Sequence, residues 1–201
     1  SSPLLRITDI AAIAEAAHRV GSIVVVDNTF LSPALQQPLN LGADIVIHST
    51  TKYINGHSDV VGGAVIAKTQ ELFERLKYWA NCLGLTASPF DAYLTLRGLR
   101  TLKARLNLHL ANTKDIVRVL GAHAAVQKVH YPGLKDHPGH AIAVKQQSGF
   151  GAMISFELQD TEEVKAFLAK LRYFSLAESL KGLPSWGPTR MMLRTGIQPA
   201  R

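Results

Sequence analysis

The chain has 201 residues, of which 47% are hydrophobic and 18% are charged, a balance typical of globular proteins rather than of disordered chains or disulfide scaffolds. Its single cysteine, Cys82, excludes an internal disulfide and fits a reducing compartment, so we expect a cytoplasmic protein. The net charge is +7, but basic residues are scattered among acidic ones, which argues against a nucleic-acid partner, and no apolar run is long enough to span a membrane.

The first predicted elements are one helix and three strands. Apolar and alanine positions at helical spacing predict a helix over residues 10–20, with Thr8 or Asp9 as its N-cap and Gly21 as its stop. Aliphatic runs predict strands over residues 23–26, 43–47 and 63–67, with a short helix over 33–39. Such continuous runs are typical of strands covered on both faces, and the pattern therefore favours an α/β sheet surrounded by helices.

The second half of the chain begins with helices and then changes in texture. A helix is predicted over residues 71–83, and helical spacing continues from residue 89 to 120 with a break near Gly98. Beyond Gly121 the pattern predicts strands over 126–131 and 151–158 and a helix over 161–171. We therefore expect a partial large domain over residues 1–113 and a smaller C-terminal α+β domain over residues 114–201.

Two of the aliphatic strands close on polar residues. Asp27 ends the first strand, and Ser49, Thr51 and Lys52 follow the second. Because ligands of open α/β sheets sit at the carboxyl ends of strands, these side chains are expected to converge on one pocket. A carboxylate there suits a protonated pyridine nitrogen, two hydroxyls suit a phosphate, and a desolvated lysine amine suits condensation with an aldehyde.

Each of these residues has a plainer explanation when taken alone. Asp27 followed by asparagine is common turn chemistry, Ser49 and Thr51 are nearly uninformative, and Lys52 by itself reads as a surface lysine. Only their joint placement at neighbouring strand ends favours a site. Gly56, together with the glycines at 62 and 63, would let the backbone approach a flat ligand closely.

The segments that carry these residues resemble the Cys/Met metabolism family of pyridoxal 5′-phosphate (PLP) enzymes. The likeness is strongest in VVDNTF at residues 25–30 and in HSTTKYINGHSD at residues 48–59, and it continues at 93–102, 131–134 and 174–180. It covers nearly the whole chain. The resemblance implies the fold of the PLP-dependent transferases of fold type I, which is aspartate-aminotransferase-like: a mostly parallel sheet with helices on both faces, and a smaller C-terminal α+β domain.

The resemblance also implies a role for each site residue. Lys52 would form the Schiff base with PLP and later move protons between substrate carbons. Asp27 would bind the pyridine nitrogen, and Ser49 and Thr51 would bind the phosphate. The substrate α-carboxylate would be held by two residues near the C-terminus, Ser179 and Arg194, and a guanidinium suits that task because it meets a carboxylate with two parallel hydrogen bonds.

Within the family, segments 31–36 and 146–158 are most similar to bacterial cystathionine γ-synthases. That likeness implies γ-replacement of O-succinylhomoserine, or another O-acylhomoserine, by cysteine to give cystathionine in methionine biosynthesis. Elimination of the cystathionine γ-lyase, β-lyase or methionine γ-lyase type remains an alternative, as does a non-catalytic fragment. The resemblance further implies amino-acid substrates and a homotetramer built from dimers.

Three departures from the family pattern bear on activity. Ser2 stands where the family has an asparagine that bonds the cofactor's phenolic oxygen. The N-terminal part of the family sequence is absent, so we expect the chain to be incomplete. The stretch 181–193 that leads to Arg194 is shorter than the corresponding family loop, which puts the roles of Ser179 and Arg194 in question.

A metal site is a further alternative. His130, His137 and His140 are spaced as ligands can be, but Pro138 and Gly139 suit a surface turn. The sequence indicates no cysteine or carboxylate that completes a tetrahedral set with these histidines, and we therefore expect no metal.

Overall fold

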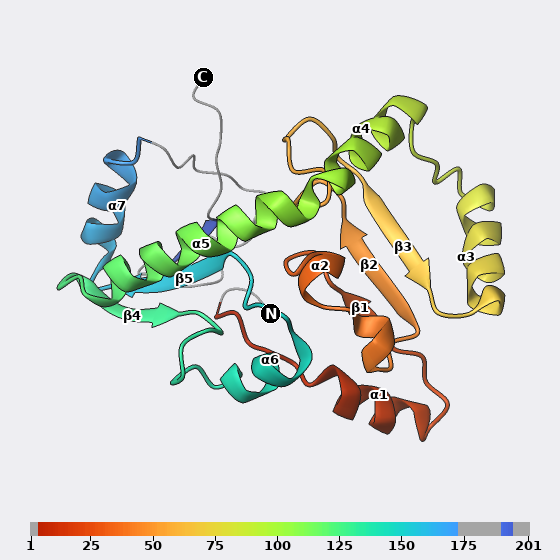
Figure 1. Ribbon diagram of the computed structural model, residues 1–201, viewed down its shortest axis with the longest axis horizontal. Coiled ribbons are helices and arrows are strands. Elements are labelled where there is room, and N and C mark those ends of the chain that lie inside the picture. The colour runs from red at the N-terminus through yellow and green to blue at the C-terminus, as the bar shows by residue number, and fades with distance from the viewer. Residues whose placement is uncertain (1–3, 173–189, 195–201) are drawn as a thin grey trace. The chain divides into compact units, whose positions relative to one another are not determined.

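A computed structural model of the chain describes residues 4–172 and 190–194. It divides into two compact units. The N-terminal unit consists of Asp9–Leu106 and Val144–Gly151, and the C-terminal unit consists of Ser1–Thr8, Asn107–Ala143 and Ala152–Arg201. The change of unit falls inside one long helix, α5 (Leu102–Gly121), which is continuous in Figure 1. The predicted domain boundary at residue 114 stays a prediction.

The N-terminal unit contains the elements expected in its sequence. They are α1 (Ile10–His18), β1 (Val25–Asp27), α2 (Ser32–Leu35), the 3₁₀ helix η1 (Pro38–Leu41), β2 (Ile45–Ser49), β3 (Gly63–Ala67), α3 (Gln70–Cys82) and α4 (Pro89–Arg100). Asp9 caps α1, because its side chain accepts a hydrogen bond of 3.0 Å from the Ala12 N–H. The single short helix expected over 33–39 is instead two shorter helices, α2 and η1.

The three strands of this unit form one sheet in the order β1-β2-β3 (Figure 1). Strands β1 and β2 are parallel, with Asp27 opposite Ile47, and β3 runs antiparallel to β2, with Gly63 opposite Ser49. The sheet is therefore mixed. Its register brings the carboxyl ends of β1 and β2 and the start of β3 to the same edge.

Helices cover one face of these strands. Ala14 of α1 packs against Val24 and Val46, and Leu39 of η1 joins that cluster. On the opposite face, the apolar side chains of Val25, Ile47 and Val65 remain 51%, 36% and 56% exposed. The continuous aliphatic runs predicted cover on both faces, and among the residues described that cover is found on one face of these strands.

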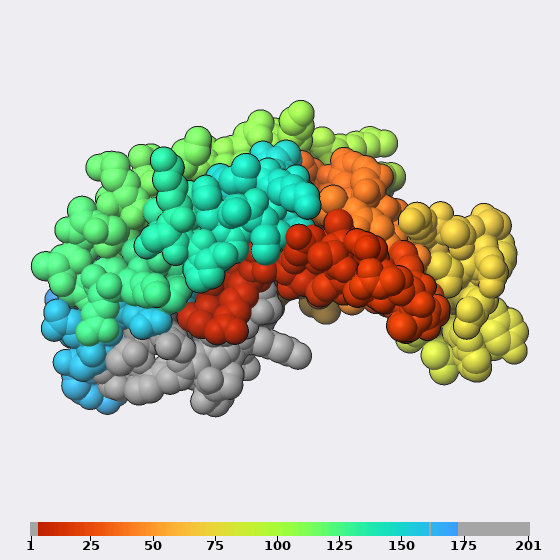
Figure 2. Space-filling view, turned by 90° about the horizontal axis from the view of Figure 1, so that it is seen from below, coloured from red at the N-terminus to blue at the C-terminus, as the bar shows by residue number. Residues whose placement is uncertain are grey.

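Helix α3 contributes no buried side chain. Its aromatic residues Phe73, Tyr78 and Trp79 are exposed, and Figure 2 shows the helix, in yellow, at the surface. In the part of the chain that the structure describes, no helix is both long and apolar enough to cross a membrane.

The helical stretch after residue 89 breaks at Thr101, not near Gly98 as predicted. Helix α4 ends at Arg100, and α5 begins at Leu102. Gly98 is buried inside α4, where a Cβ atom would overlap the backbone carbonyl of Asn55. The glycine therefore permits close packing between α4 and the chain after β2, which explains its presence without a break.

A cluster of side-chain amides ties the segment Val144–Gly151 into the N-terminal unit. The Gln36 Oε1 atom accepts hydrogen bonds from the side-chain amides of Gln146, at 3.2 Å, and Gln147, at 3.0 Å. The Gln36 amide donates in turn to Asn28 Oδ1 at 3.0 Å. Asn28 directly follows β1, and this amide cluster therefore links the end of that strand to residues more than a hundred positions later.

The C-terminal unit is an α+β arrangement. Its elements are the rest of α5, β4 (Val126–His130), most of α6 (His140–Gln146), β5 (Met153–Leu158), α7 (Thr161–Ala169) and β6 (Arg190–Arg194). Strands β4, β5 and β6 form an antiparallel sheet with β5 in the centre. Phe156 of β5 packs edge-to-face on Phe167 of α7, with ring centroids 5.7 Å apart. Helix α6 was not predicted from the sequence, because seven residues give too short a periodic pattern.

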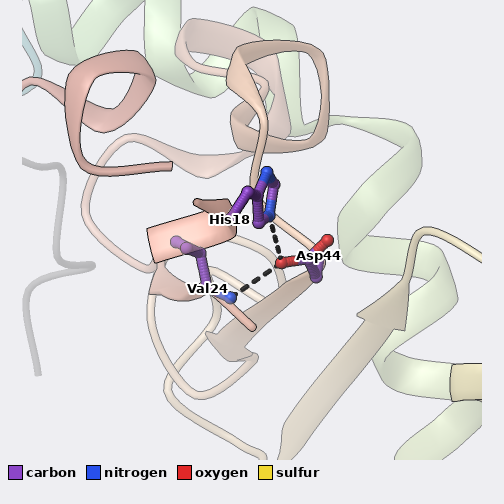
Figure 3. A network of polar contacts seen from close by, with 3 residues as sticks. All are labelled: His18, Val24 and Asp44. Atoms are coloured by element: carbon purple, nitrogen blue, oxygen red, sulfur yellow. Dashed lines mark hydrogen bonds and ion pairs between the residues drawn. The ribbon is translucent and has the colours of Figure 1, made fainter. Parts of the chain in front are cut away.

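One carboxylate fastens α1 to the start of the sheet (Figure 3). The Asp44 Oδ2 atom accepts a hydrogen bond of 2.7 Å from the Val24 N–H and lies 2.9 Å from His18 Nε2, at the end of α1. The hydrogen bond with His18, followed by that from Val24, lowers the pKa of Asp44 below its usual value.

We expect Asp44→Ala to lower the free energy of unfolding of the full-length protein by roughly 1–2 kcal/mol at neutral pH, because two hydrogen bonds to the carboxylate are lost. Folding lowers the pKa of Asp44, so its contribution is present above the unfolded value of about 3.8 and is lost as pH falls from there through the folded pKa. Urea unfolding at neutral pH and at about pH 3 measures both effects.

Asp115→Ala is the matched control, because Asp115 is 78% exposed and pairs only loosely with Arg118, at 3.8 Å. An equal loss for Asp44→Ala at both pH values would contradict the assignment.

Candidate functional site

Two of the predicted site residues, Asp27 and Ser49, lie at one edge of the N-terminal sheet. Asp27 ends β1 opposite Ile47, and Ser49 ends β2 two residues further along. Because side chains two positions apart on a strand share a face, Asp27 and Ser49 project from the same face of the sheet. Asp27 is exposed and Ser49 is half-buried among the residues described.

Thr29 joins these two strand ends. Its N–H donates to Asp27 Oδ1 at 2.9 Å, and its hydroxyl oxygen accepts a hydrogen bond of 2.8 Å from the Ser49 N–H. The first bond is an Asx turn, so the plainer explanation of Asp27 as a turn residue is also true. Thr29 is buried, and it therefore holds the carboxylate and the serine in fixed relation. Sequence reasoning gave Thr29 no role, although its place two residues after a strand-ending aspartate is a turn signal.

Lys52 lies in a tight loop that follows β2, here called the Lys52 loop (residues 50–56). Backbone hydrogen bonds run from the Lys52 N–H to the Ser49 carbonyl at 3.3 Å, from the Asn55 N–H to the Thr50 carbonyl at 3.0 Å, and from the Gly56 N–H to the Lys52 carbonyl at 2.9 Å. Lys52 is half-buried. Backbone hydrogen bonds thus hold both the N–H and the carbonyl of Lys52. They fix the position of the Cα atom from which the lysine side chain extends.

Thr51 fastens the Lys52 loop to the start of β3. Its hydroxyl accepts a hydrogen bond of 3.0 Å from the Gly62 N–H and donates back to the Gly62 carbonyl at 3.4 Å. The second distance is long for an O–H donor, so that bond is weak and its proton is readily redirected to a better acceptor. Gly62 lies so close to the loop that a Cβ atom there would come within 2.9 Å of Thr50 Oγ1.

His48 is a buried neighbour of this edge. Its Nδ1 atom has no hydrogen-bond partner among the described residues. Burial lowers the pKa of His48, and the Asp27 charge and a backbone hydrogen bond to Asn28 oppose that effect only in part. The imidazole is therefore neutral at neutral pH.

A series of polar contacts connects the Lys52 loop to α4 through Asp59. The Asn55 amide donates to Asp59 Oδ1 at 2.6 Å, and the other Asp59 oxygen lies 3.5 Å from Arg97 of α4. The hydrogen bond from Asn55 lowers the pKa of Asp59, so the carboxylate stays charged under mildly acidic conditions.

Two predicted site residues are not placed beside the others. Ser179 lies outside the described residues. Arg194 ends β6 opposite Met153, in the C-terminal unit, whereas Asp27, Ser49, Thr51 and Lys52 belong to the N-terminal unit.

The three histidines weighed as metal ligands have separate partners. His130 Nε2 lies 2.8 Å from a Glu157 carboxylate oxygen, His137 Nε2 lies 3.3 Å from the Leu4 carbonyl, and His140 Nδ1 lies 2.8 Å from the Pro132 carbonyl. Over residues 4–172, no group of three or more His, Cys, Asp or Glu side chains is arranged to hold a metal ion.

The donor set at the sheet edge fits PLP. A carboxylate held by a backbone N–H, two hydroxyls and an amine correspond to the pyridinium nitrogen, the phosphate and the aldehyde of that molecule. The chemistry of these groups, and not the distance between any two of them, makes the correspondence.

Comparisons with known proteins agree with this correspondence. The profile of the family described as Cys/Met metabolism PLP-dependent enzyme matches residues 1–188. Cystathionine gamma-synthase of Escherichia coli (strain K12) is 55% identical over 186 residues, which are 92% of this chain and 48% of that protein. Cystathionine beta-lyase of Lactococcus lactis subsp. cremoris (strain MG1363) is 50% identical over 185 residues, which are 92% of this chain and 49% of that protein. The chain thus spans about half the length of these relatives.

Solved structures show the same relationship. The cystathionine gamma synthase of Xanthomonas oryzae pv. oryzae in complex with aminoacrylate and cysteine has a TM-score of 0.94 and 53% identity, over 98% of this chain and 57% of that one. The cystathionine gamma-lyase of Lactobacillus plantarum complexed with L-serine has a TM-score of 0.90 and 38% identity, over 98% of this chain and 58% of that one. The fold is therefore that of the fold type I PLP enzymes.

The Thr29 junction gives a direct test. We expect Thr29→Val to lower the free energy of unfolding of the full-length protein by about 1–3 kcal/mol, because the Ser49 N–H loses its acceptor at a buried position. Thr29→Ser keeps the hydroxyl and should stay within about 1 kcal/mol of the original protein. Chemical denaturation compares the two, and a loss in Thr29→Ser that exceeds the loss in Thr29→Val would show that the methyl group, rather than the hydrogen bond, matters.

Proposed function

The chain belongs to the Cys/Met metabolism family of PLP-dependent enzymes, and from that membership we propose a role for its sheet edge and an activity for the full-length protein. The observation that carries the proposal is the placement of Lys52, in an internally bonded loop, directly after the strand that lies beside Asp27. The lysine of the sequence motif is thus the residue that this loop carries.

We assign the cofactor contacts as follows. The Lys52 amine would hold PLP at the aldehyde carbon, with the aldehyde oxygen lost as water. Asp27, whose Oδ1 is held by the Thr29 N–H, pairs with the protonated ring nitrogen. The hydroxyls of Ser49 and Thr51 donate to the phosphate, and the weak bond from Thr51 to the Gly62 carbonyl leaves its proton available for that purpose.

When bound, PLP supplies an electron sink that makes the neighbouring substrate C–H bonds acidic. Lys52 would hold PLP, and its amine would also take the proton from the substrate α-carbon and move protons at the β-carbon. Ser179 and Arg194 are assigned to the substrate α-carboxylate.

For the activity, we propose γ-replacement of the cystathionine γ-synthase type. In O-succinylhomoserine the bond between Cγ and the ester oxygen breaks, succinate leaves with the electron pair, and the cysteine sulfur bonds to Cγ with loss of the thiol proton. The 55% identity to the E. coli synthase and the 53% identity to the X. oryzae synthase support this assignment. The proposal includes a homotetramer and a cytoplasmic location.

Elimination is the second candidate. The L. lactis β-lyase is 50% identical to this chain, close to the value for the E. coli synthase. Both reactions require the same cofactor lysine and begin with removal of the substrate α-proton, so the described edge of the sheet suits either one.

The cofactor lysine is tested in the full-length protein. Reduction of the PLP-loaded protein with borohydride should fix PLP on Lys52, as peptide mass mapping reads out. Lys52→Ala should lose the label and at least about a hundredfold in turnover, because no positioned base remains. Lys103→Ala, on the exposed face of α5, serves as the control. A label that persists in Lys52→Ala would place the cofactor elsewhere.

The activity is tested with O-succinylhomoserine, with and without cysteine, and separately with cystathionine as the substrate. We expect cystathionine and succinate to form in equal amounts when cysteine is present. Product analysis by mass spectrometry and an oxoacid assay distinguishes the outcomes. Formation of pyruvate or 2-oxobutyrate from cystathionine, with no cystathionine synthesis, would favour the lyase assignment instead.

A further inference from the structure

Arg105, in the first turn of α5, connects the Lys52 loop to the helix break at Thr101. Its Nη1 donates to the Tyr53 carbonyl at 2.9 Å, and its Nη2 donates to the Ile54 carbonyl at 3.2 Å and to the Gly98 carbonyl at 2.7 Å. Its Nε donates to the Thr101 hydroxyl at 3.0 Å. All of these residues belong to the N-terminal unit.

Arg105 binds two carbonyls that directly follow a carbonyl bonded within the loop. Within the loop, backbone N–H groups satisfy the carbonyls of Thr50 and Lys52. The next two carbonyls, of Tyr53 and Ile54, accept from the guanidinium. Tyr53 and Ile54 are 0% and 7% exposed, and a backbone carbonyl in such a setting needs a partner inside the protein.

Two glycines make room for this contact. Gly56 has a φ of +75°, and a Cβ atom there would overlap the Arg105 guanidinium. Gly98 carries one of the carbonyls that Arg105 binds, and a Cβ atom there would overlap the Asn55 carbonyl. The Lys52 loop and the end of α4 thus pack so closely that neither glycine position has room for a Cβ atom. The Arg105 guanidinium lies between the two segments.

We propose that Arg105 is a positioning residue that fixes the backbone directly after Lys52, and so sets the point from which the lysine amine reaches PLP. This role rests on the proposed function. Arg105 acts through the carbonyls of Tyr53 and Ile54, which are one and two residues beyond the lysine. Movement of these peptide groups moves the Cα atom that carries the reactive side chain.

The geometry requires a guanidinium. Its three nitrogens bond four oxygens on two segments of chain in a planar fork. A lysine ammonium has three donors at a single point and cannot span these acceptors. The position of the Arg105 guanidinium also suits a cation. The Gly98 carbonyl that it binds belongs to the last turn of α4, where the helix dipole is negative.

The test compares Arg105→Ala and Arg105→Lys with Arg118→Ala in the full-length protein. Arg118 lies on the same helix, and its side chain is 76% exposed. Hydrogen exchange is measured on the PLP-free proteins for the amides of residues 52–56, with the amides of β1 and β2 as reference. The PLP concentration for half-saturation, and the pH dependence of the visible band of bound PLP, are then measured by absorbance.

We expect faster exchange at residues 52–56 than at the reference amides in both Arg105 variants. We also expect about a tenfold rise in the PLP concentration for half-saturation and a shifted pH profile of the band. Added guanidinium ion at low concentration should restore PLP binding to Arg105→Ala in part, and Arg118→Ala should match the original protein.

Two results would overturn the role of Arg105. One is exchange and PLP binding in both Arg105 variants that match those of Arg118→Ala. The other is exchange that rises equally across β1, β2 and the loop without recovery by guanidinium, which would make Arg105 a general stability residue. A borohydride label away from Lys52 in the original protein would contradict the proposed function instead, while the exchange of the PLP-free loop would still report on Arg105.

Discussion

The hydroxyl of Thr29 holds together the ends of two parallel strands, and the candidate site depends on that junction. Parallel pairing places Asp27 and Ser49 at one edge, but each strand ends in backbone groups that the sheet no longer bonds. Thr29 supplies a donor to Asp27 and an acceptor to the Ser49 N–H, so the chain leaves both strands in a fixed geometry. The Lys52 loop starts from that fixed point.

Much of this edge could be predicted from sequence, because it follows from local patterns. Aliphatic runs marked β1, β2 and β3, and the polar residues that end them identified Asp27, Ser49 and Lys52 as a group. The residues that form hydrogen bonds to the Lys52 loop could not be predicted from local sequence patterns. Arg105 meets the Lys52 loop from 52 positions away, a contact that depends on tertiary packing and leaves no periodic trace. Gly98 was misread as a helix break for the same reason, since its small size serves a neighbouring segment.

The described edge defines what the cofactor end of the site requires and leaves the choice of reaction to other parts of the protein. In the proposed assignment a carboxylate, two hydroxyls and a lysine contact PLP, and relatives named as a synthase and as a lyase are similarly close to this chain. The two reactions share the loss of the α-proton and then differ in the bond that breaks, at Cγ in the synthase and at Cβ in the β-lyase. Rigid support beneath Lys52, from Thr29 on one side and Arg105 on the other, serves both chemistries equally.

The amide cluster around Gln36 has a consequence for biosynthesis. Gln146 and Gln147 complete the hydrogen bonds that hold Asn28 beside β1, yet the ribosome makes them long after both strands. During synthesis the Gln36 side chain therefore gains these two partners only after the helices and strands between residues 36 and 146 have been made.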